Sequence, residues 1–201
     1  MLTLQKKTSL TTSLDFVNTV GWRESAAAEE HLPSYKDLLE WGLKHGVIGP
    51  QEYENADSDA STSPVDAAAV HHRALKLRED LYVIFSAMID GRDPDAVAMA
   101  RFNEALSEAL SHLKLVRGES GYELSIRDGR RLEVLPWRIA VSAADLITSD
   151  KFDRVKRCAS EGCNWLFLDE SKNRSRRWCD MSNCGNIMKA RRHYARIRAS
   201  R

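Results

Sequence analysis

The chain of 201 residues has none of the short motifs that mark the common enzyme chemistries. It contains no glycine-rich phosphate loop, no nucleophile elbow and no HExxH pair. Long apolar runs are also missing: the longest candidate, Leu81 to Ile89, is half the length of the roughly 18 residues that a membrane span requires. Near the N-terminus, Asp15 interrupts the region in which a signal peptide would need an unbroken apolar core. We therefore expect a non-enzymatic, cytoplasmic protein with no membrane partner.

Cysteine is absent from the first 157 residues, and the chain then has four: Cys158, Cys163, Cys179 and Cys184. They form two pairs of equal spacing, which is typical of a tetrahedral zinc site in which two short loops supply the thiolates. The alternative is two disulfides, which require an oxidising compartment for which the sequence offers no export signal. We expect one structural Zn²⁺, because four thiolates leave no open position for catalysis.

The formal net charge of +1 hides an acidic part and a basic part. Residues 1–150 contain sixteen Lys and Arg against twenty-four Asp and Glu, whereas residues 151–201 contain fourteen against five. The net charges are therefore −8 and +9, and the basic part is also the part with the cysteines. Such asymmetry is typical of chains that bind nucleic acid or a membrane surface.

Apolar periodicity predicts that residues 1–150 form one domain, a mainly α body with a small β-hairpin (α+β). Helices are expected from Pro33 to His45, from Val65 to Ile89, from Asp93 and Pro94 to about Leu113, and onward from Pro136. Alternation around GESG at 118–121 indicates the hairpin, and Asp128 and Gly129 mark the next turn. The polar stretch DSDASTSP at 57–64 is expected to be a connection between helices.

The segment LDFVNT, residues 14–19, places Asp15 and Asn18 three residues apart on one helical face. Its apolar residues can be buried, which leaves two interpretations of the polar pair. The pair either lines a ligand pocket or caps the next helix, and the spacing alone favours capping.

Residues 151–201 are expected to form a second, small domain, a treble-clef or ribbon-like zinc finger that ends in a basic helix. The first cysteine pair precedes a short apolar strand at 164–168, and the second precedes the helical sequence GNIMKARRHYARIRASR. In that helix Ile187, Ala190, Tyr194 and Ile197 recur with helical spacing, so we expect them to pack on the finger.

Basic residues gather on the other side of this helix and in the loop between the cysteine pairs. The candidate nucleic-acid-binding residues are Lys172, Arg174, Arg176, Arg177, Lys189, Arg191, Arg192, His193, Arg196 and Arg198. Cationic groups at this density neutralise backbone phosphates and release counterions. The alternative is a zinc-stabilised interaction module whose basic ridge meets an acidic protein surface.

Residues 158–198, CASEGCNWLFLDESKNRSRRWCDMSNCGNIMKARRHYARIR, resemble the bacterial CGNR zinc-finger family, which is named for the residues around its last cysteine. The body resembles the ABATE domain that accompanies this finger, through LDFVNT, RALKLREDLYVIFSAMIDG at 73–91 and PWRIAVSAADLI at 136–147. One position departs from the pattern, because the family's arginine after CGN is Ile187 here.

The resemblance implies a bacterial, stress-induced regulator of transcription that holds one structural Zn²⁺ through Cys158, Cys163, Cys179 and Cys184. Its finger would contact nucleic acid, with duplex DNA as the expected partner. Its body would sense a small-molecule effector or mediate assembly into a homo-oligomer. If the family's arginine contacts phosphate, Ile187 implies weaker binding by this chain.

Overall fold

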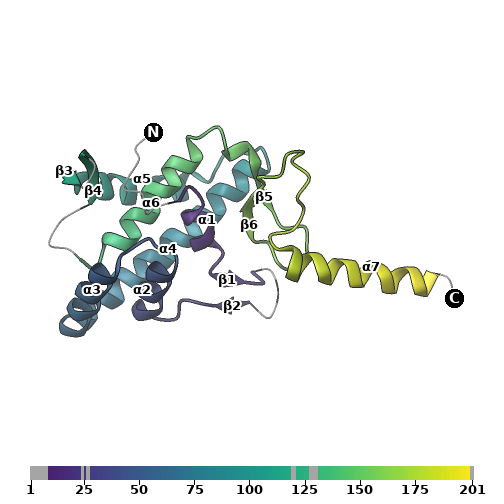
Figure 1. Ribbon diagram of the computed structural model, residues 1–201, viewed down its shortest axis with the longest axis horizontal. Coiled ribbons are helices and arrows are strands. Elements are labelled where there is room, and N and C mark those ends of the chain that lie inside the picture. Colours follow the sequence, from purple (N-terminus) through teal and green to yellow (C-terminus); the bar gives the residue numbers. More distant parts are fainter. Residues whose placement is uncertain (1–8, 24, 26–27, 119–120, 127–130, 200–201) are drawn as a thin grey trace.

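The computed structural model describes residues 9–23, 25, 28–118, 121–126 and 131–199, and it has the expected mainly α-helical architecture (Figure 1). The helices are α1 (Thr12–Val17), α2 (Tyr35–Lys44), α3 (Pro50–Thr62), α4 (Pro64–Ile89), α5 (Ala96–Ser111), α6 (Val134–Ile147) and α7 (Asn186–Ala199). Three antiparallel pairs hold the strands: β1 (Val20–Gly21) with β2 (Glu29–Glu30), β3 (Leu113–Gly118) with β4 (Gly121–Ile126), and β5 (Val155–Arg157) with β6 (Leu166–Leu168). The predicted turn at Asp128 and Gly129 lies outside the described residues.

The long helix α4 runs through the middle of the body, where α1, α2, α3, α5 and α6 all contact it (Figure 1). Its inward stripe includes Leu77, Leu81, Ile84 and Phe85, all of which are buried. Burial of a side chain of this size contributes about 1.5–3 kcal/mol, so the stripe is a main source of the body's stability. In the part of the chain that the structure describes, no helix is both long enough and apolar enough to cross a membrane.

Local sequence signals place several elements correctly. The side chain of Ser34 caps α2 by accepting a hydrogen bond from the backbone N–H of Asp37, and Gly46 follows the helix at a φ of +67°. Helix α4 and the hairpin of β3 and β4 lie where the periodicity predicts them. These parts of the prediction are confirmed.

The polar stretch at 57–64 is a correction, because it is helical rather than a connection. Helix α3 includes it up to Thr62, and α4 begins at Pro64 after a single non-helical residue. The helix is started by Pro50 and by the Glu52 carboxylate, which accepts a hydrogen bond from the backbone N–H of Gly49 at 2.8 Å. Only Ala56 in α3 is fully buried, so the apolar pattern that would have indicated a helix is nearly absent. Helix α5 also begins later than expected, with Asp95 as its cap.

Residues 151–201, which we call the tail, contain the two strands β5 and β6. These strands pack directly on the body, with β5 against α4 and β6 against α1. Val155, Leu166 and Leu168 belong to the same buried cluster as the core of the body. The side chain of Asn18 stabilises this contact through two hydrogen bonds with the backbone of Leu166. Its Nδ2 donates to the Leu166 carbonyl at 2.7 Å, and its Oδ1 accepts from the Leu166 N–H at 2.9 Å. The indole N–H of Trp165 donates to the carbonyl of Val20 at 2.9 Å. We call this contact surface of β5 and β6 with α1, β1 and α4 the seam.

Helix α7 extends away from the rest of the molecule (Figure 1). The prediction that its apolar residues pack on the finger is wrong at Ala190, which is exposed, and at Ile197, which is 41% exposed. Helix α7 contacts the short π-helical turn Met181–Gly185 that precedes it. The side chain of Tyr194 lies outside the described residues.

Replacement of Asn18 by alanine is expected to weaken the seam. The Leu166 N–H is buried, and the variant leaves both this donor and the Leu166 carbonyl without their partner. An unmade hydrogen bond of this kind costs about 1–3 kcal/mol. Urea unfolding of the zinc-loaded protein should show a loss of this size, whereas Asn173→Ala, at an exposed position in the tail, should have little effect. Equal stabilities of the two variants would contradict this account of the seam.

Candidate metal centre

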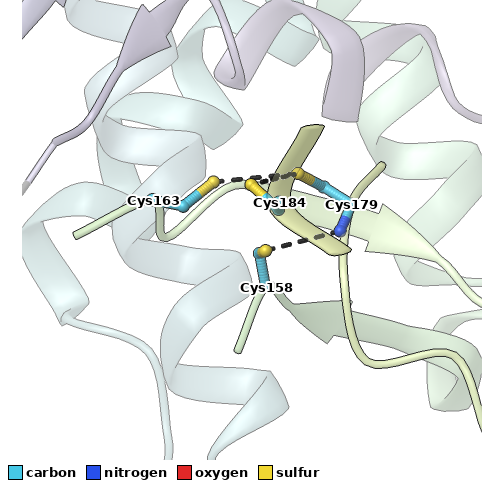
Figure 2. Close-up of side chains that lie close together, drawn as sticks. All are labelled: Cys158, Cys163, Cys179 and Cys184. Carbon is cyan, nitrogen blue, oxygen red and sulfur yellow. Dashed lines mark hydrogen bonds between the residues drawn. The ribbon is translucent and has the colours of Figure 1, made fainter. Parts of the chain in front are cut away.

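The four cysteines come from two turns and one helix start (Figure 2). Cys158 follows β5 and its N–H donates to the carbonyl of Trp165 at 2.8 Å, which closes the turn that carries Cys163. Gly162 sits in this turn at a φ of +80°, a conformation that glycine adopts without strain. Cys184 lies in the π-helical turn that leads into α7, so the fourth ligand directly precedes that helix.

The sulfur atoms converge as a tetrahedral zinc site requires. The Sγ atoms of the four cysteines all lie within 4.8 Å of one another. The Sγ atom of Cys179 is 3.7 Å from that of Cys163 and 3.7 Å from that of Cys184 (Figure 2). A Zn–S bond of about 2.3 Å implies about 3.8 Å between sulfur atoms in a regular tetrahedron. The four side chains therefore fit one structural Zn²⁺ and would fill its coordination.

The site lies in an apolar shell to which the body also contributes. Cys158, Cys163 and Cys184 are buried, and Cys179 is half-buried. Phe167, Trp165 and Trp178 of the tail pack around them, and so does Trp22, which follows β1. Exclusion of water by this shell favours a metal that stays bound.

The thiols shift one another's protonation because they are so close. Hydrogen bonds from Cys163 and Cys179 lower the pKa of Cys158. The hydrogen bond with Cys158 is also the main cause that raises the pKa of Cys163, to about 12, and that raises the pKa of Cys179. Without a metal the cluster therefore retains protons at neutral pH that zinc binding must displace.

Arg176 has a structural position beside the metal centre. Its Nε donates to the carbonyl of Trp178 at 2.9 Å, and its terminal nitrogen donates to the carbonyl of Cys179. The guanidinium carbon lies 4.6 Å from the centre of the Phe167 ring. Although Arg176 is among the predicted nucleic-acid-binding residues, its guanidinium is engaged by the finger itself.

Asp169 organises the loop between the two cysteine pairs. Its fully buried carboxylate accepts hydrogen bonds from Lys156 Nζ at 2.6 Å, from the N–H and hydroxyl of Ser171, and from the N–H of Arg176 at 3.0 Å. The Lys156 ammonium group and the Ser171 side chain hold the pKa of this carboxyl well below its usual range. The ionised carboxylate therefore fixes both ends of the loop 171–176.

The other predicted basic residues are largely at the surface. Lys172, Arg174, Arg177, Lys189 and Arg198 are exposed. Arg191 is exposed and forms an ion pair with Glu161 at 2.6 Å. The side chains of Arg192, His193 and Arg196 lie outside the described residues, although α7 includes their backbone. Ile187, at the position of the family's arginine, is half-buried.

Asp15 and Asn18 both line a cleft between α1, α2 and Trp165, with a volume of about 460 Å³. Asn18 does not cap the next helix, which is capped by Ser34, and instead bonds to Leu166 across the seam. Burial raises the pKa of Asp15, while His45 and a hydrogen bond with Thr11 act in the opposite direction.

Sequence reasoning missed the parts played by Trp22, Arg176 and Asp169. Trp22 is more than 130 positions from the cysteines, and no local pattern connects the two regions. Asp169 does carry a signal, because it is an acidic residue directly after the apolar strand β6 in an otherwise basic segment. A carboxylate next to a buried strand could have been predicted to bind the nearby cations.

Zinc binding is expected to release two or more protons at pH 7. The raised pKa values of Cys163 and Cys179 mean that both are thiols in the metal-free protein, and each must lose its proton to bind zinc. The affinity for zinc should therefore fall as the pH is lowered. Calorimetric titrations in two buffers of different ionisation enthalpy measure the number of protons. Release of less than one proton would contradict this description of the cluster.

Asp169→Asn is expected to release the loop 171–176 while the zinc stays bound. The amide cannot neutralise Lys156 or accept its full set of hydrogen bonds. Because the loop contains Lys172, Arg174 and Arg176, limited trypsin digestion should cut the variant there several-fold faster than the unmodified protein.

Glu170→Gln is the matched control for that variant, since it removes the same charge at an exposed neighbouring position. Chelation of the zinc provides the fully released loop for comparison. Equal cleavage rates for the two variants would show that Asp169 does not hold the loop.

Comparisons with known proteins agree with this geometry. The family model described as "CGNR zinc finger" matches residues 154–197, and the ABATE model, described as "Putative stress-induced transcription regulator", matches residues 10–150. A search of curated proteins found no match. Since the second model spans well over half of the chain and the first contains the four clustered cysteines, the chain belongs to the ABATE family and ends in a CGNR zinc finger.

Proposed function

We propose that the chain is a bacterial, cytoplasmic regulator of transcription that binds duplex DNA through its zinc finger. The observation that carries the proposal is the exposure of basic side chains on two parts of the finger, the loop 172–177 and the projecting helix α7. In our assignment, residues 151–201 contact nucleic acid, and residues 1–150 sense an effector or mediate assembly into a homo-oligomer.

The shape of α7 suits a nucleic-acid groove. Its 14 residues correspond to about 21 Å of helix, and most of that length extends beyond the body (Figure 1). The major groove of B-DNA is about 12 Å wide and admits one α-helix. Lys189, Arg191 and Arg198 are exposed along α7, so cationic groups are available to contact phosphates.

The loop adds a second group of cations whose backbone is already ordered. Lys172, Arg174 and Arg177 are exposed, while Asp169 and Lys156 hold the main chain beneath them. An ordered loop loses less conformational entropy when it binds than a free one. The loop is therefore suited to fix the orientation of the finger on a phosphate backbone.

The ion pair between Arg191 and Glu161 indicates how the surface behaves without a partner. Both side chains are more than half exposed, and a surface ion pair contributes only about 0–1 kcal/mol. A phosphate group can replace the carboxylate of Glu161 at little cost. The same contact also supports a second function, because it shows a carboxylate bound to the basic face of α7.

That second function is a zinc-stabilised interaction module which binds an acidic protein surface and no nucleic acid. The body itself carries a net charge of −8, so acidic surface is available on other copies of the chain. The two functions differ in the partner that competes for the same cations.

Binding to duplex DNA is expected to weaken steeply as salt rises, because each phosphate contact releases a counterion. Titrations of a fluorescent duplex at several salt concentrations measure this slope. Arg174→Ala with Arg177→Ala, and Arg192→Ala with Arg196→Ala, should each lower the affinity about tenfold or more and reduce the slope.

The control pair is Arg73→Ala with Arg92→Ala, which removes two exposed arginines from the body and should leave binding unchanged. No binding at low salt, or equal binding by all three double variants, would refute the proposal. Capture of an acidic protein surface under those conditions would favour the interaction module.

A further inference from the structure

The cleft that contains Asp15 and Asn18 has the size of a small-molecule site. Its volume is about 460 Å³, and ligand pockets usually range from about 300 to 1,000 Å³. Its walls come from α1, from α2 and from Trp165 of the tail, so it opens beside the seam.

Negative charge dominates the lining of this cleft. Asp15, Asp37 and Glu40 face a single lysine, Lys44, together with His31 and His45. Asp15 is half-buried, and it has no lysine or arginine of the described residues as an ion-pair partner. A carboxylate that has lost part of its hydration in this way gains most from a cation that enters the cleft.

The arrangement of the acidic groups does not fit a metal ion. Within the described ranges, only the four cysteines bring three or more ligand atoms close enough to share one ion. The carboxylates instead line different parts of the cleft, and this arrangement suits an organic cation that is larger than a metal ion.

Aromatic rings supply the apolar part of the cleft. Trp165 is half-buried, and its indole N–H already donates to the carbonyl of Val20, so the side chain offers the cleft its apolar ring. His45 stacks on Trp41 with 4.8 Å between ring centres. Indole rings attract organic ammonium groups, and the attraction is strongest where water is excluded.

We propose that this cleft binds a small organic ammonium compound, with Asp15 and Glu40 as its counter-charges and Trp165 as its aromatic wall, and that binding stabilises the seam. The link is direct, because Asn18 and Trp165 line the cleft and also hold β6 and the preceding turn to the body. The effect on transcription rests on the proposed function, whereas the binding site does not.

Benzylammonium is a suitable probe, and benzyl alcohol is its neutral counterpart with the same ring. Nuclear magnetic resonance titration of the full-length, zinc-loaded protein should show about tenfold tighter binding of benzylammonium. The indole N–H signal of Trp165 should shift, and the Leu166 amide, which donates to Asn18, should exchange more slowly with solvent.

Asp15→Asn is expected to lower the affinity for benzylammonium at least fivefold without changing that for benzyl alcohol. Asp145→Asn is the matched control, because Asp145 is also half-buried with a pKa raised by burial but does not line the cleft. If Asp15→Asn does not fold, Glu40→Gln replaces it in the test, because Glu40 is exposed and its substitution should also lower the affinity for benzylammonium.

Equal affinities for the two probes, or equal losses in Asp15→Asn and Asp145→Asn, would overturn the site. An unchanged exchange rate of the Leu166 amide under saturating benzylammonium would overturn its link to the seam. Both measurements are made without nucleic acid, so they stand even if the chain proves not to bind DNA. With DNA present, a shift of about threefold or more in its affinity is the expected regulatory effect.

Discussion

The structure of the tail depends on the close approach of four cysteine sulfur atoms, which lie within 4.8 Å of one another. Thiolates about 3.7 Å apart repel one another by about 1 kcal/mol per pair even at the dielectric constant of water, and by more in an apolar shell. A dication bound among the thiolates replaces this repulsion with attraction. The turn after β5 and the π-helical turn before α7 are then held together, because Cys158 and Cys163 belong to the first segment and Cys184 to the second. The direction in which α7 leaves the body follows from that connection.

The metal is not the only anchor of the finger. A strand pair as short as β5 and β6 has little stability by itself, and here it rests on α1 and α4 within the main core. Arg157 reinforces the contact by pairing with Asp90 at the end of α4. The finger is thus held at one end by zinc and at the other by the body. A change at the seam can therefore reach the cysteines through the few residues between β6 and Cys163.

The sequence predicted what depends on neighbours along the chain. Cysteine spacing indicated the metal ligands, and apolar periodicity indicated α4, because each pattern lies within a short stretch of the chain. The helix at 57–62 was missed because it buries almost nothing, and the expected packing of α7 on the finger was wrong at Ala190 and Ile197, which are exposed. Contacts such as those of Asn18 with Leu166 join positions 148 residues apart, and no local pattern records them.

A count of charges along the chain treats every cation alike. The structure instead distinguishes cations that are bound within the fold from cations that lie at the surface. Within the basic tail, Lys156 is bound to Asp169, Arg157 to Asp90 and Arg176 to the carbonyls beside Cys179. These groups organise the fold, and moving any of them to a phosphate would require breaking a contact that holds the finger. The cations left at the surface are fewer than a charge of +9 implies, but they are concentrated on a fixed loop and a projecting helix. Position rather than total charge therefore determines what this surface can bind, since a few ordered cations with matching geometry bind phosphate better than many scattered ones.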